Sequence, residues 1–331
     1  MSATSSTVDK LASMDVFDGC APDLLAPVAE LLRPVCADVG QVLMHQGEQA
    51  VCFLLIESGR AEVRHVGDDG AVVLGELSAG AIVGEIALLR GAARTATVTV
   101  TEQLTGFIGD RLAFEALAGT DFVTERLVRT ARQRLAAFVA PIPIRLADGT
   151  ELTLRPVLPG DNERIARGQV EYSRETLYRR FMSLNGPSVA LMNYLFEVDY
   201  VHHFGWVLTD GLDGPVVADA RFVVDEQDSA LAEVAFIVGD RYQGRGIGNL
   251  LMDALVVAAQ VSGVRRFCAS VLSENAPMRA ILDRFGANWT RDEPGVVTTE
   301  FDVPALDELR IDRAVVGQIR DATLQVLRAV G

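Results

Sequence analysis

The clearest change of pattern along the chain lies between residues 232 and 261, where a strand pattern gives way to a helical one. Residues 232–238 alternate at first and then become fully apolar, which is typical of a strand buried in a sheet. A glycine-rich stretch, 243–248, follows, and from 247 to 261 the pattern is helical. The sequence therefore predicts a strand, a glycine loop and a helix in direct succession.

Short apolar segments on both sides of this stretch predict a sheet in the C-terminal half of the chain. The turn residues Asp148-Gly149 separate the first two segments and favour a hairpin. The segments 216–224 and 231–238 are expected to be the central antiparallel pair, and 297–303 is expected to close the sheet. The predicted strands are, in chain order, 144–150, 151–155, 205–209, 216–224, 231–238, 266–271 and 297–303.

The N-terminal half has a different pattern. Residues 9–33 carry the apolar positions of one or two short helices, and from Val39 onward short strands are broken by glycines. Regular short strands with such breaks favour a β-barrel or jelly roll. Residues 112–138 then predict a helix with a basic face, and Ala140-Pro141-Ile142-Pro143-Ile144 predicts a stiff, extended linker.

The tail of the chain adds one more element. Residues 305–331 have apolar positions at spacings near three and four, which predicts an amphipathic helix beyond the sheet. The expected organisation is a domain from 1 to 140, a second from 141 to 304, and a helical extension from 305 to 331. Two roles for this extension stay open: plain packing at the domain junction, or a lid over a groove of the second domain.

Composition narrows the class of protein. The chain has 331 residues, which suits two ordinary domains, and 49% of them are hydrophobic, enough for sizeable cores. We expect neither a membrane span nor a secretion signal, because the apolar runs are too short. The formal net charge of −15 argues against non-specific binding to nucleic acid or to an acidic membrane.

Cysteine and histidine positions favour a cytoplasmic protein without a metal site. The four cysteines are scattered without metal-like spacing, so free thiols in a reducing compartment are expected. His202 and His203 are adjacent, and neighbouring side chains in a strand point apart. No carboxylate cluster has matching spacing, so we expect no metal.

The glycine-rich stretch has the chemistry of an anion site. Gly244, Gly246 and Gly248 let backbone amides approach a ligand, and the free amides at a helix start favour phosphate. The spacing is G-x-G-x-G, and no acidic residue ends a second strand about 20 residues on, so a dinucleotide fold is not indicated. Taken alone, the stretch could also be a structural turn.

Further residues give this stretch a family resemblance. Gln243-x-x-Gly246-x-Gly248 resembles the acetyl-CoA pyrophosphate loop of GNAT-type N-acetyltransferases, and Ser273–Met278 resembles the segment whose asparagine contacts CoA. Segments 154–161 and 175–181 resemble the N-terminal GNAT elements of bacterial protein acetyltransferases. The resemblance assigns these residues to acetyl-CoA: Phe236, Ile237, Val238, Gln243, Gly244, Arg245, Gly246, Ile247, Gly248, Asn275 and Arg284.

The same resemblance implies a catalytic residue. Glu233 opens the strand before the loop, where many GNAT enzymes carry their general base, and a buried carboxylate with a raised pKa would serve best. A strand amide near Ile237 or Val238 is expected to polarise the thioester carbonyl. Many GNAT enzymes place a tyrosine acid seven residues after the motif asparagine. Here that position is Leu282, so the resemblance assigns no proton donor for the thiolate.

A second resemblance lies in the N-terminal half. Gly80–Leu89, followed by Arg94-Thr95-Ala96, resembles the phosphate-binding cassette of cyclic-nucleotide-binding domains, and 40–48 and 53–63 resemble strands of their β-roll. It implies that Arg94 pairs with the cyclic phosphate and that Glu85 accepts from the ribose. The residues it assigns to cAMP are Gly84, Glu85, Ile86, Ala87, Arg94, Thr95 and Arg134, with Arg132 as the alternative to Arg134.

The two domains together resemble the cyclic-nucleotide-regulated protein lysine acetyltransferases of mycobacteria and relatives. This implies an α+β protein of two domains, an N-terminal cyclic-nucleotide-binding β-roll with flanking helices and a C-terminal GNAT mixed α/β sheet with the added helix. The implied function is transfer of acetyl groups from acetyl-CoA to protein lysines under control of cAMP. A cAMP-regulated small-molecule amine acetyltransferase and a non-catalytic acyl-CoA and cAMP sensor stay open.

Overall fold

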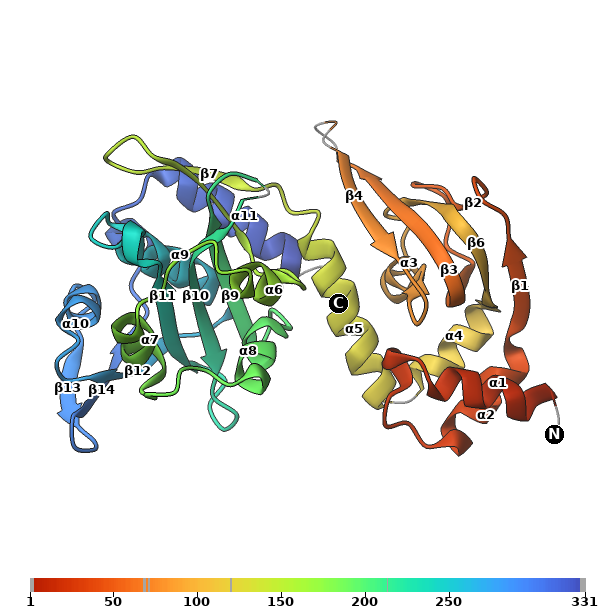
Figure 1. Ribbon diagram of the computed structural model, residues 1–331, viewed down its shortest axis with the longest axis horizontal. Coiled ribbons are helices and arrows are strands. Elements are labelled where there is room, and N and C mark those ends of the chain that lie inside the picture. Colours follow the sequence, from red (N-terminus) through yellow and green to blue (C-terminus); the bar gives the residue numbers. More distant parts are fainter. Residues whose placement is uncertain (1–2, 68–69, 71, 120, 213, 328–331) are drawn as a thin grey trace. The chain divides into compact units, whose positions relative to one another are not determined.

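The computed structural model describes residues 3–67, 70, 72–119, 121–212 and 214–327. The chain divides between Arg134 and Leu135 into two compact units (Figure 1). No helix within the described ranges is both long and apolar enough to cross a bilayer.

The first unit is built on two long strands that pair antiparallel, β3 (Cys52–Val66) and β6 (Thr97–Asp110). The sheet order is β1-β6-β3-β4, with β2 beside β6 and β5 beside β3. Leu54, Ile56 and Val98 are buried in the core of this β-roll. Its shorter strands are β1 (Arg33–Ala37), β2 (Val42–Met44), β4 (Val72–Leu77) and β5 (Ile82–Val83).

Helices flank the roll and share a second core with it. Phe17, Phe53 and Leu127 are fully buried in that core, so helices and strands are packed together. The prediction of one or two short helices over residues 9–33 is confirmed, since the structure has two helices there with a 3-10 turn between them. The helical elements of this unit are α1 (Ala3–Ala12), η1 (Asp15–Phe17), α2 (Pro22–Leu31), α3 (Glu85–Arg90), α4 (Arg111–Ala118) and α5 (Asp121–Ala136).

The single helix predicted over 112–138 is wrong, because the structure divides it into α4 and α5. Asp110 begins α4 by accepting a hydrogen bond from the Ala113 amide at 3.1 Å, which caps the helix. Gly119 ends α4, and its amide donates back to the Glu115 carbonyl at 2.9 Å. Glycine has low helix propensity, so the chain turns here instead of continuing.

The second unit contains an eight-stranded sheet in the order β13-β14-β12-β11-β10-β9-β8-β7. The pairing of β11 with β12 is parallel, and the other ladders found in this sheet are antiparallel. The strands are β7 (Ile142–Arg145), β8 (Glu151–Pro156), β9 (His203–Thr209), β10 (Val216–Val224), β11 (Leu231–Val238), β12 (Arg266–Leu272), β13 (Asn288–Arg291) and β14 (Val296–Asp302).

Helices cover both faces of this sheet. Arg221 of β10 reaches the Leu195 carbonyl on one face, whereas Phe236 of β11 points to the start of α9 on the other. The helical elements of this unit are α6 (Asp161–Ala166), α7 (Arg174–Phe181), α8 (Val189–Phe196), η2 (Asp240–Tyr242), α9 (Ile247–Ser262), α10 (Ala276–Asp283), η3 (Leu306–Glu308) and α11 (Arg313–Leu327). Thus α7 and α8 lie over the face opposite to α9 (Figure 1).

Two expectations about this sheet have different outcomes. The hairpin is confirmed: Gly149 has a φ of 86°, and the Thr150 amide donates to the Asp148 carboxylate at 3.0 Å. The prediction that 297–303 closes the sheet is wrong, because β13 pairs on the outer side of β14. The β13 sequence Asn-Trp-Thr-Arg is short and does not alternate between apolar and polar residues, so its pattern gives no strand signal.

The predicted C-terminal helix is present as α11, and it packs on α9. Ile319 and Val326 are fully buried in the core of the second unit. The segment before it is also held, since the Arg310 amide donates to the Asp253 carboxylate at 3.3 Å. In this arrangement α11 has a packing role. The lid role stays a prediction, and it requires a second arrangement of the tail.

Candidate functional site

The sheet of the second unit opens between β11 and β12. These strands are paired over only three residues, Leu231, Ala232 and Glu233 of β11. On its other side β11 stays paired with β10 as far as Val238. The edge of β11 after Glu233 therefore faces a gap, with backbone groups available to a ligand.

One backbone bond shows which amides face the gap. The Gly239 amide, just beyond β11, donates to the Val217 carbonyl at 2.8 Å. Bonded pairs alternate along an antiparallel ladder, and this ladder has no register shift. The Ile237 amide therefore points to β10, whereas the amides of Phe236 and Val238 point to the gap. Of the two predicted carbonyl-polarising amides, only that of Val238 is directed there.

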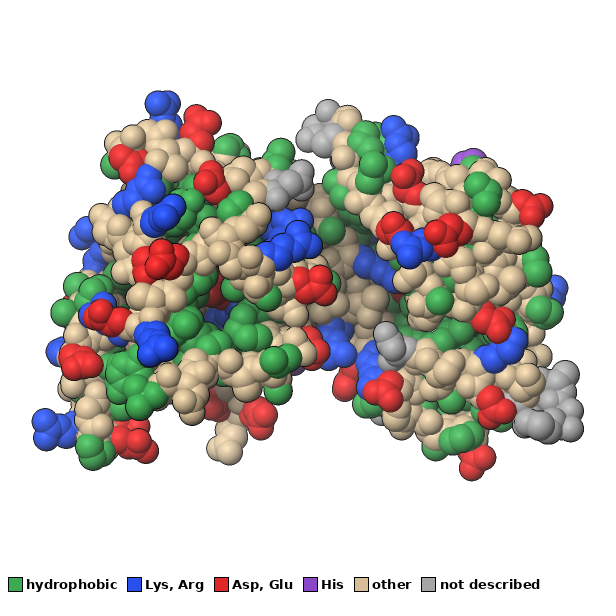
Figure 2. Space-filling view, viewed as in Figure 1, with side chains coloured by type: hydrophobic (Ala, Val, Ile, Leu, Met, Phe, Trp, Pro, Cys, Tyr) green, Lys and Arg blue, Asp and Glu red, His purple; other side chains and the backbone are tan. Residues whose placement is uncertain are grey.

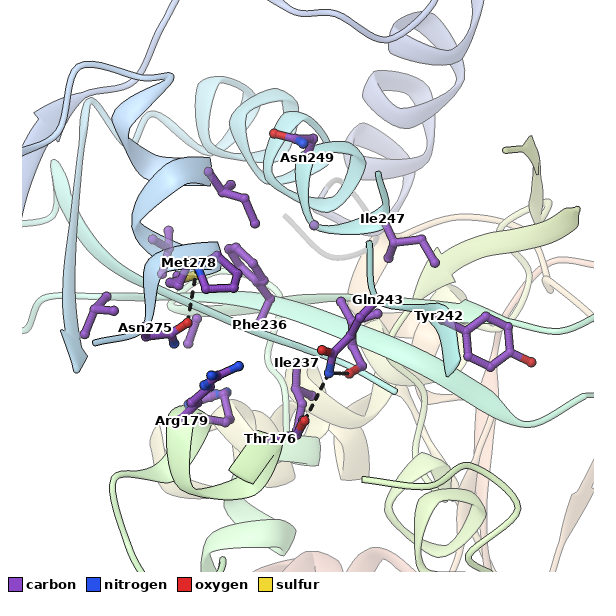
Figure 3. Close-up of a pocket in the computed structure, with 18 of the residues that line it drawn as sticks. Thr176, Arg179, Phe236, Ile237, Tyr242, Gln243, Ile247, Asn249, Asn275 and Met278 are labelled. Carbon is purple, nitrogen blue, oxygen red and sulfur yellow. Dashed lines mark hydrogen bonds between the residues drawn. The ribbon is translucent and has the colours of Figure 1, made fainter. Parts of the chain in front are cut away.

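A cavity of about 430 Å³ lies in this gap (Figure 3). The predicted residues Glu233, Phe236, Ile237 and Val238 line it from β11. In Figure 3, Phe236 lies beside Met278 of α10, and Ile237 lies near Thr176 of α7. Other predicted residues on its wall are Gln243, Gly244, Gly246, Ile247, Gly248 and Asn275. The structure thus brings together most of the predicted acetyl-CoA residues.

The glycine loop ends at the start of α9. Gly246 precedes the helix with a φ of 86°, and Gly244 has a φ of 71°, conformations that side chains rarely adopt. The Gln243 amide group donates to the Val238 carbonyl and to Thr176 Oγ1, both at 3.0 Å, which fixes the loop against β11 and α7. The first backbone amides of α9, a helix of 16 residues, consequently lie at the cavity wall.

Three predicted CoA residues have structural partners. Asn275 caps α10 by accepting from the Met278 amide at 3.3 Å, and it also lines the cavity. The Arg245 side chain pairs with Asp148 at 2.6 Å, so only the backbone of Arg245 is available to a ligand of the glycine loop. Arg284 pairs with Asp253 of α9 and is absent from the cavity wall.

Glu233 stands at the cavity wall as an exposed carboxylate. It is thus not the buried carboxylate that would serve best as a base, and it is the last residue of β11 that pairs with β12. Its cross-strand neighbour is Cys268, whose thiol pKa is raised to about 11 by burial, with the charge of Glu233 adding to the effect. A carboxylate in contact with water can exchange protons with solvent.

The hydroxyl groups on the cavity wall are the candidates to donate the proton that a tyrosine donates in many GNAT enzymes. Leu282 is fully buried in α10 and offers no proton. Thr176 donates to Asp240 at 2.6 Å, and Tyr242 donates to Asp210 at 3.0 Å, so both hydroxyls are occupied. Ser270 on β12 is exposed to the cavity, and the sequence analysis did not single it out.

A buried charge cluster lies under α7 and α8. Arg221 donates from Nε to Asp219 at 3.0 Å and from Nη1 to the His203 ring at 3.2 Å. Burial, together with the positive charge of Arg221, lowers the pKa of His203 to about 4. Arg180 of α7 belongs to the same electrostatic group and lines the cavity. The sequence missed the cluster, since strand alternation alone does not say which polar residues are covered.

The adjacent histidines are separated by the start of β9. His202 is exposed and contacts Asp199 at 3.2 Å, whereas His203 is buried beside Arg221. Within the described part of the chain, no three His, Cys, Asp or Glu residues gather where they could hold a metal ion.

The predicted cyclic-nucleotide cassette forms a compact group in the first unit. Gly84 precedes α3 with a φ of 89°, and a Cβ there would lie 2.5 Å from Arg94 Nη1. Arg94 is buried, and its guanidinium donates to the carbonyls of Gly84 and Cys52 at 2.9 and 2.6 Å. The Thr95 carbonyl contacts the His65 ring at 2.6 Å. Ile86 and Ala87 lie in the first turn of α3.

Glu85 and Arg134 are joined within this cassette. Glu85 is fully buried, and its Oε1 accepts from Arg134 Nη1 at 2.6 Å. The same nitrogen donates to the Ile82 carbonyl at 2.5 Å. The other carboxylate oxygen, Oε2, is buried without a hydrogen-bond partner among the described residues. An unsatisfied acceptor of this kind fits a ligand hydroxyl.

The two sites define a class: an acyltransferase fold with a splayed sheet, joined in one chain to a nucleotide-binding roll. Residues 151–288 match the Acetyltransferase (GNAT) domain family, and residues 36–121 match the Cyclic nucleotide-binding domain family.

Two relatives match over nearly the whole chain, and a third matches over part of it. The chain is 54% identical to Acetyltransferase Pat of Mycolicibacterium smegmatis over 320 residues, 97% of this chain and 96% of that protein. It resembles the solved structure of a cAMP-binding acyltransferase from Mycobacterium smegmatis, with 50% identity, 99% and 98% coverage and a TM-score of 0.54. Acetyltransferase PA5475 of Pseudomonas aeruginosa is 28% identical over 44% of this chain and 80% of that protein. The chain belongs to the family of these GNAT acetyltransferases.

Proposed function

We propose that this protein is a protein lysine Nε-acetyltransferase that uses acetyl-CoA and is controlled by cAMP. In this proposal residues 1–140 bind cAMP, 141–304 carry out transfer, and 305–331 form the extension. The observation that carries it is the gap between β11 and β12, which has Glu233 on its wall and the glycine loop at the start of α9. The names of the whole-length relatives agree with both parts.

The free edge of β11 suits the extended arm of acyl-CoA. The arm carries amide groups, which can pair with backbone groups of β11 that face the gap, such as those of Phe236, as a missing strand would. Its pyrophosphate fits the amides of the loop that includes Gly246, because a helix start favours phosphate. The thioester then lies in the cavity toward Glu233.

The reaction requires a neutral amine. A lysine ammonium has an ordinary pKa near 10.4, so it must lose a proton before it can attack. Glu233 accepts that proton, directly or through water, and the nitrogen then forms a bond to the thioester carbon. The Val238 amide stabilises the oxygen anion and the C–S bond breaks. The attacking nitrogen then releases its second proton to solvent, and the thiolate takes up a proton from solvent, directly or relayed through the Ser270 hydroxyl.

An exposed apolar surface next to the cavity favours a protein acceptor. It follows the chain from the end of α7 through α8, and Met182 belongs both to it and to the cavity wall. Figure 2 shows hydrophobic side chains on this part of the second unit. Exposed patches of this kind mark protein contacts. Its members are Met182, Leu184, Val189, Leu191 and Tyr194.

In the first unit, bound cAMP would replace hydrogen-bond partners that the cassette residues have in this structure. Its phosphate replaces backbone carbonyls as the acceptor for Arg94, which strengthens the bond because the acceptor is charged. Its ribose hydroxyl fits the unpartnered oxygen of Glu85. We place the protein in the cytoplasm.

The test is transfer of labelled acetyl groups from acetyl-CoA to proteins of a lysate, with and without cAMP. We expect labelled lysines whose amount changes with cAMP, and no label above background with the Glu233→Gln variant. Label on small amines alone, or none with the native chain under either condition, contradicts the proposal.

A further inference from the structure

Arg180 is the cavity residue whose chemistry the proposed mechanism does not use. Its side chain is mostly buried, it lines the cavity, and its Nε is buried without a hydrogen-bond partner in the described part of the chain. No ion pair found among the described residues includes it, whereas its neighbour Arg179 pairs with Glu175. Arg180 is thus a guanidinium at a cavity wall that has no anionic partner within salt-bridge distance among the residues the structure describes.

The nearby carboxylates do not satisfy this charge. Asp219 is already held by Arg221 through Nε at 3.0 Å and through a second guanidinium nitrogen. Glu233 is exposed to solvent. Burial lowers the pKa of Arg180, and the charge of Arg221 lowers it further, while Asp219 and Glu233 oppose these effects. The cavity wall therefore offers a partly desolvated cation, which favours an added anion.

The planar shape of a guanidinium selects among anions. Two parallel N–H donors fit a carboxylate in a fork, and such a bond is stronger than a neutral one. The phosphates of CoA fit the glycine loop at the start of α9, so they do not account for Arg180. What remains for the cavity is a carboxylate carried by a substrate near its reacting group.

We propose that Arg180 forms a carboxylate-binding subsite, so that the enzyme takes a substrate with a carboxylate beyond the reacting carbon or nitrogen. The carboxylate has two possible sources. It ends the acyl group of a dicarboxylic acyl-CoA donor such as succinyl-CoA, or it belongs to the acceptor. The inference rests on the proposed acyl transfer in this cavity. Succinyl transfer follows the same balance: a C–N bond forms, the C–S bond breaks, and the amine proton goes to Glu233.

The donor arm of the test measures equilibrium binding of succinyl-CoA and acetyl-CoA to the full chain by calorimetry. For native protein we expect succinyl-CoA to bind at least about tenfold more tightly, the effect of one charge-assisted bond. Arg180→Met should remove that ratio and Arg180→Lys should keep part of it. Arg174→Met is the matched control, since it removes an exposed charge of α7 outside the cavity wall and should keep the native ratio.

The acceptor arm uses acetyl-CoA with two small lysine analogues. Nα-acetyl-lysine carries a carboxylate, and Nα-acetyl-lysinamide does not. If the acceptor is the source, kcat/KM for the first should exceed that for the second by about tenfold in native protein. Arg180→Met should bring the two values together, while the Arg174→Met control should not.

The inference is overturned if native protein shows neither preference, or if Arg180→Met leaves both ratios unchanged. Equal loss of activity with every substrate in Arg180→Met also overturns it, because that pattern means Arg180 only positions the site. The donor arm measures binding without turnover. A native chain that acetylates nothing but prefers succinyl-CoA through Arg180 therefore contradicts the proposed function and not this inference.

Discussion

At the scale of single residues, the position of Glu233 decides whether the cavity is catalytic. Glu233→Gln keeps the shape of the side chain and removes its basicity. We expect acyl-CoA affinity to stay near native and turnover at saturating substrate to fall by about 10²–10⁴-fold, the usual contribution of a general base. Glu226→Gln is the control, because Glu226 is an exposed carboxylate of the loop between β10 and β11 that does not line the cavity. Unchanged turnover in Glu233→Gln would place the base elsewhere.

The buried His203 makes the second unit sensitive to acid. Its folded pKa of about 4 lies below the ordinary 6.5, because burial disfavours the charged ring and Nε2 accepts from Arg221. The unfolded chain therefore binds a proton at a higher pH than the folded chain does. Stability is full above pH 6.5 and falls as pH drops toward 4, by about 2 kcal/mol between pH 7 and 5.

Urea unfolding measured by tryptophan fluorescence tests this effect. The chain has two tryptophans, Trp206 and Trp289, and both lie in the second unit. We expect His203→Gln, which keeps an acceptor without a titrating ring, to lose less stability than native protein between pH 7 and 5. An equal loss in both proteins would show that other groups cause the acid sensitivity.

At the scale of elements, α11 acts as part of the core of the second unit. Ile319 is fully buried on the face that packs on α9. We expect Ile319→Ala to lower the free energy of unfolding by about 2–5 kcal/mol in the same fluorescence assay. Arg320→Ala, at the next and exposed position, should change it by less than about 0.5 kcal/mol. Similar values for the two variants would mean that α11 contributes little to the folded unit.

This packing affects how the lid hypothesis can be tested. Truncation after Pro304 removes a possible lid and also takes away the helix that packs on α9 and buries Ile319 and Val326 in the core. Loss of cAMP dependence in such a truncation could therefore come from damage to the fold. Charge changes in the segment 302–312 leave α11 in place and separate the two effects.

The sequence predicted the elements well where pattern and chemistry agreed. The strand at 232–238, the glycine loop and the helix from Ile247 follow from local periodicity and from glycine conformations, which are properties of neighbouring residues. The direction of Arg245 toward Asp148, and the pairing of Arg134 with Glu85, depend on residues far away in the chain. Periodicity carries no information about such partners.

The same limit explains the errors at the site. The exposure of Glu233 depends on where β12 leaves β11, and a strand pattern does not encode that point. Arg180 has no salt-bridge partner among the described residues because the neighbouring carboxylates are already paired. Asp219 pairs with Arg221, and Glu175 pairs with Arg179. Only the folded arrangement shows which charge is left without a partner.

At the scale of the whole molecule, regulation requires that cAMP binding in the first unit changes transfer in the second. Arg94→Ala should lower cAMP affinity by more than about 1.5–3 kcal/mol, the usual value of a hydrogen bond to a charged group, because the buried phosphate loses its expected cation. Calorimetry measures this loss. Arg64→Ala, at an exposed position of β3, is the control and should bind cAMP as the native chain does.

The activity of the same variants tests the coupling. Native protein and Arg64→Ala should respond to cAMP over the same concentration range, and Arg94→Ala should need far more. A response of Arg94→Ala at native cAMP concentrations would remove the cassette assignment. Allosteric coupling between two binding sites is typically worth about 1–3 kcal/mol, so the affinity for acyl-CoA with and without cAMP should differ by about 5–150-fold if the coupling acts on binding.

The short ladder between β11 and β12 has a consequence for the lifetime of the protein. An open strand edge is a site where another chain can pair, and it leaves the unit easier to open locally. An acyl-CoA that fills the gap stabilises the folded chain by mass action, by about 2.7 kcal/mol at a hundredfold excess over its dissociation constant. Proteolysis and aggregation would then slow when acyl-CoA is abundant and quicken under starvation. The supply of substrate would thereby set the amount of enzyme as well as its rate.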